Sequence, residues 1–448
     1  MEAIEYYRLP TCHLGTNVKL LKIIFVAVLL HLSGSLQAKT LTVVLLANAS
    51  TQDVIQKFFK EYSRDHPGID FNISIIPYTA LTAKINTMAT AGEPPDILLV
   101  TTSYIQTFAE QALDLAQYTN GADLLNRYLP SYQAFVKSGD KVIGVPMAAT
   151  VNGLFYNKEL FKQAGVSVPT DPDHIWSWSE FKDVVQKVKE LQTCRIGVAY
   201  DCSVQRWSNL LYQANGRWIS PDGKTILPDR EAAARALTFF RSLVEAKLVP
   251  TSSWPGKTDG GPLFRTGVTA LMWAGNWELK TLLGGGTDFA FGTTYFPKEV
   301  IRAACPGGDL LMGFRKSRNH DDAAKVLLWW AEPLTIKRYL ESLGGSLLSP
   351  MKDLPVNYGK YSDYLKPMLD DLAATPQWVA EDLARPELNL LQNDLLDQLI
   401  LFSTGRTRLE ETFSQIQKLG SQVPQRSQPV SETCPQCGER RQPKRPTR

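Results

Sequence analysis

Residues 41–62 read LTVVLLANASTQDVIQKFFKEY, a strand pattern that runs directly into a helix pattern. The apolar run at 41–46 is typical of a buried strand, and Asn48, Ser50 and Thr51 then supply cap-type side chains. Large side chains lie on one face of the helix that follows, at Val54, Ile55, Phe58, Phe59 and Tyr62. The stretch therefore predicts a strand followed at once by an amphipathic helix.

The pattern then repeats. Apolar residues alternate over 69–75 as in a strand, 81–88 has helical spacing, and 96–100 (DILLV) is a third strand. Strand, helix, strand, helix and strand in succession predict a parallel α/β sheet. Ligands collect at the carboxyl ends of such strands, and these ends are rich in polar or aromatic side chains and carry no charge. They suit a neutral, hydroxyl-rich ligand better than a phosphate or a metal ion.

A second α/β region is expected from about residue 151. Helices are predicted at 178–191 and 231–245, and strands at 196–200, within 264–277 and at 289–296. From residue 321 to about residue 419 the pattern is helical. After that the composition turns to Gln, Ser, Pro and Arg, which predicts a disordered basic tail at 421–448.

The distribution of charge argues against one class of partner. The chain of 448 residues has a net charge of +3, and the segment after Gln425 alone carries six basic residues against two acidic ones. The body of the protein is therefore close to neutral and gives no electrostatic case for binding nucleic acid.

Residues 1–38 have the pattern of a secretory signal peptide. Lys19 and Lys22 precede an apolar run at 23–32, and small residues lead to a cleavage point after Ala38. The apolar run is short for a transmembrane span, although an uncleaved membrane anchor is the alternative. We expect a protein that is exported and soluble in the periplasm.

The cysteines do not form a dense disulfide framework. Cys194 and Cys202 flank a predicted strand that would hold their sulfur atoms roughly 25 Å apart, too far for a bridge. A bridge between Cys202 and Cys305 stays open. Cys434 and Cys437 lie in the tail without a second pair to complete a zinc site, so we expect a non-catalytic appendage there.

Motifs for catalysis or metal binding are lacking in the sequence. The five histidines are scattered, and neither a nucleophile elbow nor a dinucleotide-binding fingerprint occurs. No spacing singles out two carboxylates for acid–base chemistry. We therefore expect no catalytic residues, no metal site and no cofactor.

The tryptophans indicate the kind of ligand. All ten follow residue 175, several of them among polar loop residues, and indole faces stack well on the apolar faces of sugar rings. Residues 264–277, FRTGVTALMWAGNW, predict a short strand that ends in Gly-Asn-Trp. Trp277 and Trp207 are expected at a ligand cleft, with packing in the core as the alternative. Trp329 and Trp330 lie in an apolar helix and are expected to pack.

Three stretches together resemble one family. They are Gly92–Ile97 (GEPPDI), the segment 144–165 that ends in YNKELFKQAG and is followed by Trp178-Ser-Glu-Phe, and the stretch 264–277 with its closing Gly-x-Trp. Each is similar to a motif of the extracellular solute-binding proteins of bacterial ABC importers, in the sugar-binding group that includes maltose-binding protein. The resemblance spans about residues 40–420.

This resemblance implies a two-lobe α/β fold. Each lobe is expected to be a mainly parallel sheet flanked by helices, with a ligand cleft between the lobes. The expected bounds are 39–149 with 297–349 for lobe I, and 150–296 with 350–420 for lobe II. The chain is expected to cross between the lobes near Ala148–Gly153, Tyr295–Lys298 and Leu348–Lys352.

The resemblance also implies ligand-binding positions. The aromatic side chain that matches Trp277 stacks on sugar in maltose-binding protein. The lobe I strand ends with Ser50, Tyr78, Thr102 and Ser103, and the turn formed by Gly307, Gly308 and Asp309, lie where relatives often contact ligand. Two further candidates do not come from relatives: Trp207, from the tryptophan pattern, and Asn276, which precedes Trp277 in the sequence. Charged residues that relatives use after the first and third strands are replaced here by uncharged ones, which argues against a maltose-like specificity.

The function implied is that of the substrate-binding component of an ABC import system. It would bind a mono- or oligosaccharide between two closing lobes and, as a monomer, deliver it to permease subunits in the inner membrane, which work with their ATPase. The alternatives are an exported carbohydrate-active enzyme, a binding protein for a glycerol phosphodiester (with Arg206 or Arg315 on the phosphate) or another small polar solute, and a chemoreceptor partner or structural surface protein.

Overall fold

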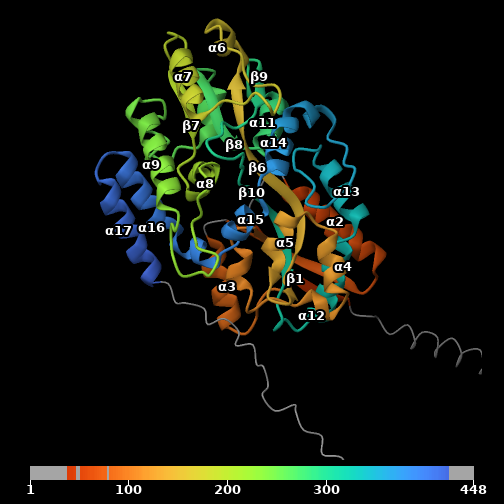
Figure 1. The fold of residues 1–448 in the computed structure, drawn as a ribbon. Helices are drawn as coiled ribbons and strands as arrows, with labels where there is room; N and C mark the ends of the chain where they lie inside the picture. The colour runs from red at the N-terminus through yellow and green to blue at the C-terminus, as the bar shows by residue number, and fades with distance from the viewer. Residues whose placement is uncertain (1–37, 47–50, 78–79, 423–448) are drawn as a thin grey trace, which may run out of the picture.

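The structure is a computed structural model that describes residues 38–46, 51–77 and 80–422 (Figure 1). The segments expected to be a signal peptide and a basic tail lie outside the described residues, as do Ser50, Tyr78, Cys434 and Cys437.

Within the described residues, eight strands form one continuous sheet in the order β2-β1-β3-β10-β6-β8-β7, with β9 also paired to β6. Their bounds are β1 Lys39–Leu46, β2 Ile69–Ile76, β3 Ile97–Thr101, β6 Val145–Asn157, β7 Ile196–Tyr200, β8 Thr269–Gly275, β9 Phe291–Thr294 and β10 Pro306–Gly313. β1 pairs in parallel with β2 and β3, and β7 in parallel with β8, whereas β10 and β6 run antiparallel to their neighbours. A separate hairpin joins β4 (Lys137–Ser138) to β5 (Lys141–Val142).

Helices cover both faces of this sheet (Figure 1). Those in the first half of the chain are α2 Gln52–Asp65, α3 Leu81–Thr90, α4 Gly121–Asn126, α5 Pro130–Val136, α6 Lys158–Gln163, α7 Trp178–Lys189 and α8 Val204–Gln213. Those in the second half are α9 Arg230–Glu245, α10 Gly260–Arg265, α11 Glu278–Thr281, α12 His320–Trp330, α13 Pro333–Ser342, α14 Ser362–Ala374, α15 Gln377–Leu383, α16 Pro386–Ser403 and α17 Leu409–Gln422. Short 3-10 helices include η2 (Ile105–Phe108).

The long strand β6 joins the two halves of the sheet. Its residues 145–151 pair with β10, and its residues 152–157 pair with β8 and β9. We call the part built on β1, β2, β3, β10 and the first half of β6 lobe I, and the part built on the second half of β6 with β7, β8 and β9 lobe II. The change of partner at Val151 and Asn152 supports a chain crossing there.

The other two crossings flank this strand. The chain enters lobe I at β10 after leaving β9, and it approaches the crossing again at Leu348, whose N–H and C=O both bond to Ala149 (2.9 and 2.8 Å). The lobe bounds expected from the sequence stay a prediction, which these pairings support.

The α/β fold class predicted from the sequence is confirmed, because strands and helices alternate through most of the chain and become all-helical after β10. Trp330 packs as expected: it is fully buried, and its ring centre lies 5.3 Å from that of Phe58. Cys202 and Cys305, whose pairing was left open, are both free thiols.

Candidate functional site

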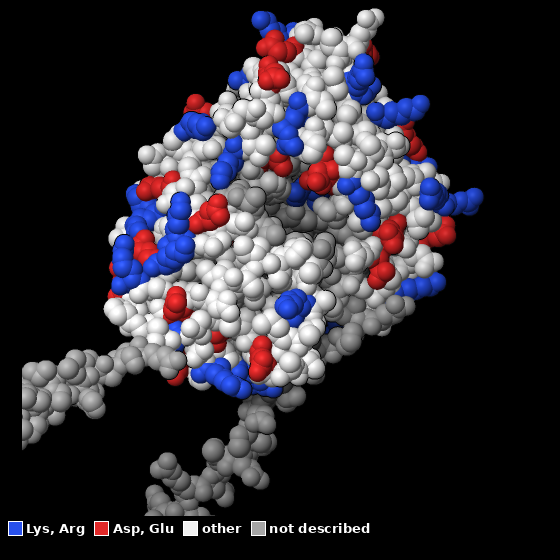
Figure 2. Space-filling model, turned by 180° about the vertical axis from the view of Figure 1, so that it is seen from behind, with Lys and Arg blue, Asp and Glu red and all other residues white. Residues whose placement is uncertain are grey.

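Five segments converge where the two lobes meet: the end of β3, the start of β10, the middle of β6, the end of β8 and the first turn of α8. Figure 2 shows the molecule hollowed at the centre of one face, between its upper and lower parts. In Figure 1 the upper part holds β7, β8 and β9, and the lower part holds β1 with α3, α4 and α12. The hollow therefore lies between lobe II and lobe I.

Gly307, the second residue of β10, places bare backbone against side chains from both lobes. A Cβ atom on Gly307 would lie 2.7 Å from Oγ1 of Thr150, 3.4 Å from Nε2 of Gln205 and 3.9 Å from Oγ1 of Thr102. Thr102 belongs to lobe I, Gln205 to α8 of lobe II, and Thr150 to the crossing strand. Hydroxyl and amide groups thus meet at one point between the lobes, with a glycine leaving room for them.

The neighbouring Gly308 is required by the backbone. Its φ angle is +150°, and a Cβ atom there would lie 2.1 Å from the carbonyl oxygen of Ala148. Its own carbonyl accepts a 3.1 Å hydrogen bond from the N–H of Thr102. Gly308 therefore lets β10 lie close to both β6 and the end of β3.

Trp277 lies two residues after the end of β8 and is half-buried. Its six-membered ring folds back over Gly275, where a Cβ atom would lie 1.8 Å from Cζ3 of the indole. The glycine at the end of FRTGVTALMWAGNW is thus explained, because any larger residue would displace the ring.

Arg206 ties the lobe II side of the cleft together. Its guanidinium carbon lies 4.7 Å from the centre of the Trp277 ring, in cation–π geometry. Its Nε donates to Asp201 (3.2 Å), and its Nη1 donates to Oδ1 of Asn152 (2.9 Å) and Oε1 of Gln205 (2.5 Å). Ser203 caps α8 by accepting the N–H of Arg206 (3.2 Å), which places this arginine and Gln205 in the first helical turn.

The charges around Trp277 are balanced. Asp201 pairs with Arg206, and Glu278 lies 3.6 Å from Arg265. Burial raises the pKa of Glu278, and the charge of Arg265 opposes that rise. Because two carboxylates face two guanidinium groups, this wall offers hydrogen-bond donors and acceptors without a strong net charge.

Asn276, expected to bind ligand, is instead fully buried and structural. Its Oδ1 accepts the N–H of Val151 (2.9 Å), and its Nδ2 donates to the carbonyl of Ser346 (2.8 Å). Both polar groups of the amide are therefore used to fasten β8 to the first crossing and to the segment that leads to the third.

Trp207, also expected at the cleft, is a core residue, and that prediction is wrong. Its side chain is fully buried, and its ring centre lies 5.4 Å from that of Trp218. Trp207 is on the inward face of α8, whereas Gln205 and Arg206 on the same helix meet the cleft. The polar residues next to Trp207 in the sequence are polar because they lie on a different face of α8 from Trp207.

Asp309 is a half-buried carboxylate for which no hydrogen bond or ion pair is found among the described residues. It lies opposite Thr101 of β3, whose hydroxyl is buried without a partner. Burial raises the pKa of Asp309 to about 6. Asp309 remains a candidate ligand residue, with unused hydrogen-bonding capacity one strand position from the Gly-Gly pair.

Replacing Asp309 with asparagine is expected to stabilise the unliganded protein at neutral pH. An unfolded Asp has a pKa of about 4, so the folded state binds the proton more tightly and loses stability as pH rises from about 4 to about 6. The Asp309→Asn variant lacks this loss and should exceed the wild type by up to about 3 kcal/mol at pH 7, with the difference vanishing near pH 4. Denaturant unfolding across that range measures it. Parallel pH profiles for the two proteins would contradict the assignment.

The remaining predicted residues divide between lobe I and the undescribed segments. Thr102 is buried, and Ser103 beside it is half-buried, both directly after β3. Ser50 and Tyr78 lie outside the described residues and stay predictions. Gln205, Asn152 and Thr150 were missed as candidates. The sequence did not single them out, because single polar residues beside hydrophobic ones occur on the surfaces of most helices and strands.

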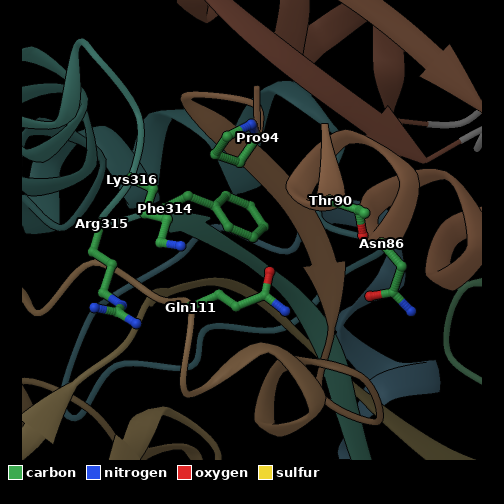
Figure 3. A pocket seen from close by; sticks show the side chains of 7 residues that line it. All are labelled: Asn86, Thr90, Pro94, Gln111, Phe314, Arg315 and Lys316. Atoms are coloured by element: carbon green, nitrogen blue, oxygen red, sulfur yellow. The ribbon is translucent and has the colours of Figure 1, made fainter. Parts of the chain in front are cut away.

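A separate cavity of about 310 Å³ lies in lobe I, at the end of β10 away from the crossing (Figure 3). It is lined by Asn86, Thr90, Pro94, Gln111, Phe314, Arg315 and Lys316. In Figure 3 Gln111 projects between the Phe314 ring and the α3 residues, while the Arg315 side chain extends to one side. Gly313 at this end of β10 pairs with Ile97 at the start of β3. The cavity therefore lies at the ends of these strands that point away from the cleft. Arg315 therefore does not serve a ligand in the cleft.

A metal site finds no support in the described part of the chain, where no three His, Cys, Asp or Glu side chains gather in a way that could hold an ion. Among the same residues no helix is long and apolar enough to cross a membrane.

A family model of bacterial extracellular solute-binding proteins matches residues 48–333. The chain belongs to this family. The multiple sugar-binding protein of Streptococcus mutans is 30% identical over 314 residues, which span 64% of this chain and 70% of that protein. Membership of a family of solute-binding proteins, rather than of enzymes, confirms the prediction of a non-enzymatic protein.

Solved structures of solute-binding proteins share the fold. The GacH receptor of Streptomyces glaucescens, solved unliganded and with acarbose, superposes with a TM-score of 0.70 at 22% identity, covering 86% of this chain and 99% of that one. An ABC substrate-binding protein of Listeria monocytogenes in complex with cycloalternan gives 0.73 at 16% identity, covering 86% and 98%. The chain therefore has the fold of these two proteins.

Proposed function

We propose that this solute-binding protein binds a neutral sugar, a mono- or oligosaccharide, in the cleft between its lobes. The lobes close over the sugar, and the protein delivers it to the permease of an ABC importer. Relatives named for binding multiple sugars and mannitol support the choice of a sugar or polyol.

One observation carries this proposal. Trp277 presents a half-buried indole on lobe II with Arg206 over its ring, and the Gln205 that bonds to this arginine lies against Gly307 of lobe I, near Thr102. An aromatic ring joined in this way to hydroxyls, amides and backbone of the other lobe suits a sugar, which has an apolar ring face and a rim of hydroxyl groups.

The charge balance favours a neutral sugar over a glycerol phosphodiester. Of the two guanidinium groups at this wall, Arg206 is the one that stacks on Trp277, and it already bonds to Asp201, Asn152 and Gln205. A phosphate would have to compete with the Asp201 carboxylate for the same guanidinium group.

We further propose that the protein acts as a monomer in the periplasm, after export by the predicted N-terminal signal peptide. Its partners would be permease subunits in the inner membrane with their ATPase. The description of the family as extracellular supports export.

A thermal-shift screen of the mature protein against sugars, glycerol phosphates and amino acids tests the function. A ligand that binds only the folded state stabilises it and therefore raises the melting temperature. At a ligand concentration of one hundred times Kd the stabilisation is about 2.7 kcal/mol. We expect one or more neutral sugars to give the largest shift. A shift by a phosphodiester or an amino acid, with none from any sugar, would refute the proposal.

A further inference from the structure

The cavity in lobe I combines positive charge with an apolar ring. Two of its lining residues, Arg315 and Lys316, are cations, and none is acidic. The others supply amide or hydroxyl groups (Asn86, Thr90 and Gln111) or apolar surface (Phe314 and Pro94). In Figure 3 the two cations lie on one side of the Phe314 ring, and Asn86 and Thr90 lie on the other.

Neither cation is neutralised within the described part of the chain. Arg315 and Lys316 are exposed, and no described acidic side chain forms an ion pair with either of them. The one hydrogen bond of the Arg315 side chain runs from Nε to the backbone carbonyl of Glu110 (3.0 Å), so both terminal amino groups of the guanidinium keep their donors. At the cleft, by contrast, Arg206 bonds to three side chains. The cavity therefore offers charged donors that an anion would satisfy.

The backbone that carries these cations is held in place. The N–H of Arg315 donates to the carbonyl of Gln111 (3.0 Å). Directly after the two cations, Ser317 donates its N–H to the carbonyl of Phe314 (3.0 Å) and its hydroxyl to the buried Asp96. The Phe314 ring itself is only 1% exposed. A ligand would thus meet a formed site and lose little affinity to ordering the protein.

We propose that this cavity binds a small organic carboxylate, with its charged group on Arg315 and Lys316 and its apolar part against Phe314. The paired donors of a guanidinium group match the two oxygens of a carboxylate. A volume of about 310 Å³ is at the lower end of the range for ligand pockets, which requires a small ligand. Inorganic phosphate would satisfy the cations but would leave the ring without a partner.

This site is separate from the proposed sugar site. Arg315 and Lys316 follow β10 at its far end, Gly313, whereas the cleft is at its first residues, Gly307 and Gly308. The carboxylate site therefore does not rest on the proposed function.

Two ring compounds of similar size provide the first test, benzoate and its neutral counterpart benzyl alcohol. Saturation-transfer NMR titrations of the mature protein at constant ionic strength should show saturable binding of benzoate. Benzyl alcohol should bind at least about tenfold more weakly, because it lacks the charge-assisted hydrogen bonds. No binding of benzoate, or equal affinity for the two compounds, would overturn the proposal. So would displacement of benzoate by an equal concentration of inorganic phosphate, since charge alone would then be recognised.

Three variants locate the bound carboxylate. Arg315→Ala/Lys316→Ala should weaken benzoate binding at least about tenfold. Lys162→Ala/Lys187→Ala removes the same charge from exposed positions on α6 and α7 of lobe II and should leave it unchanged. Asn86→Trp, an exposed change on α3, should fill the cavity and abolish binding although both cations remain.

Unchanged melting temperatures verify that the variants are folded. Binding that survives in Asn86→Trp would mean that surface charge alone holds the anion, and would overturn the cavity site. An equal loss of affinity in the lobe II control would do the same.

The sugar with the largest thermal shift separates the two sites. At a saturating concentration it should leave the affinity for benzoate unchanged, and displacement of benzoate would place the carboxylate in the cleft and overturn the proposal. If no sugar binds, the proposed function fails, and the benzoate titrations of the wild type and the variants still decide the carboxylate site.

Discussion

Replacing Trp277 with alanine is expected to weaken sugar binding about 30-fold and to leave the fold intact. Stacking a sugar ring on the indole buries roughly 80 Å² of apolar surface, which at about 25 cal/mol per Å² is ~2 kcal/mol. This free energy corresponds to about 30-fold in Kd. Isothermal titration with the sugar found by thermal shift measures it.

Two further variants make this result interpretable. Trp277→Phe keeps a smaller platform and should recover part of the affinity. Trp329→Ala removes another half-buried tryptophan, on α12 of lobe I among Phe58, Tyr62 and Trp330, and should leave Kd unchanged. If Trp277→Ala instead keeps its affinity, or lowers the unliganded melting temperature as far as a core substitution would, the indole is not a sugar platform.

Replacing Asn276 with alanine is expected to lower the free energy of unfolding by about 3 kcal/mol. The reason is that the N–H of Val151 and the carbonyl of Ser346 would each lose a hydrogen bond, in a place where Val151 is 1% and Ser346 4% exposed. A buried polar group left without a partner costs about 1–3 kcal/mol. Denaturant unfolding measures the loss, and Asn126→Ala, an exposed change at the end of α4, is the control.

An aspartate at the same position sharpens the test. Asn276→Asp can still accept from Val151, but its second oxygen donates to Ser346 only when it is protonated. Burial raises the pKa of such a carboxyl group, so the variant should be closest to the wild type in acid and lose stability as pH rises. Asn276→Ala with wild-type stability and no sugar binding would return Asn276 to the ligand site and refute its structural role.

The fold could be predicted from sequence because its signals are local and strong. Two continuous apolar runs, LTVVLL and DILLV, form the strands expected of them. The helical spacing that includes Phe58 and Phe59 forms the expected helix. The arrangement of two lobes around a crossing strand was predicted only from the resemblance to a known family, because the periodicity of a strand does not reveal its partners, as the pairing of β10 with β3 and β6 illustrates.

The site was harder to predict because side-chain direction decides it. Trp207 and Arg206 are adjacent in sequence, yet α8 turns one into the core and the other towards the cleft. Asn276 precedes Trp277, but its amide finds backbone partners 125 and 70 residues away. No pattern within a short window carries such information.

The path of the chain through β6 bears on how the protein is made. Lobe I is completed by β10, residues 306–313, which pairs with the edge of β3 at residues 97–101. During synthesis every residue of β6 through β9 must be added before that partner strand exists. Until then the nascent chain exposes an unpaired, apolar strand edge, the kind of surface on which polypeptides aggregate. The interval before residue 306 emerges is therefore the period in which the growing chain most needs protection.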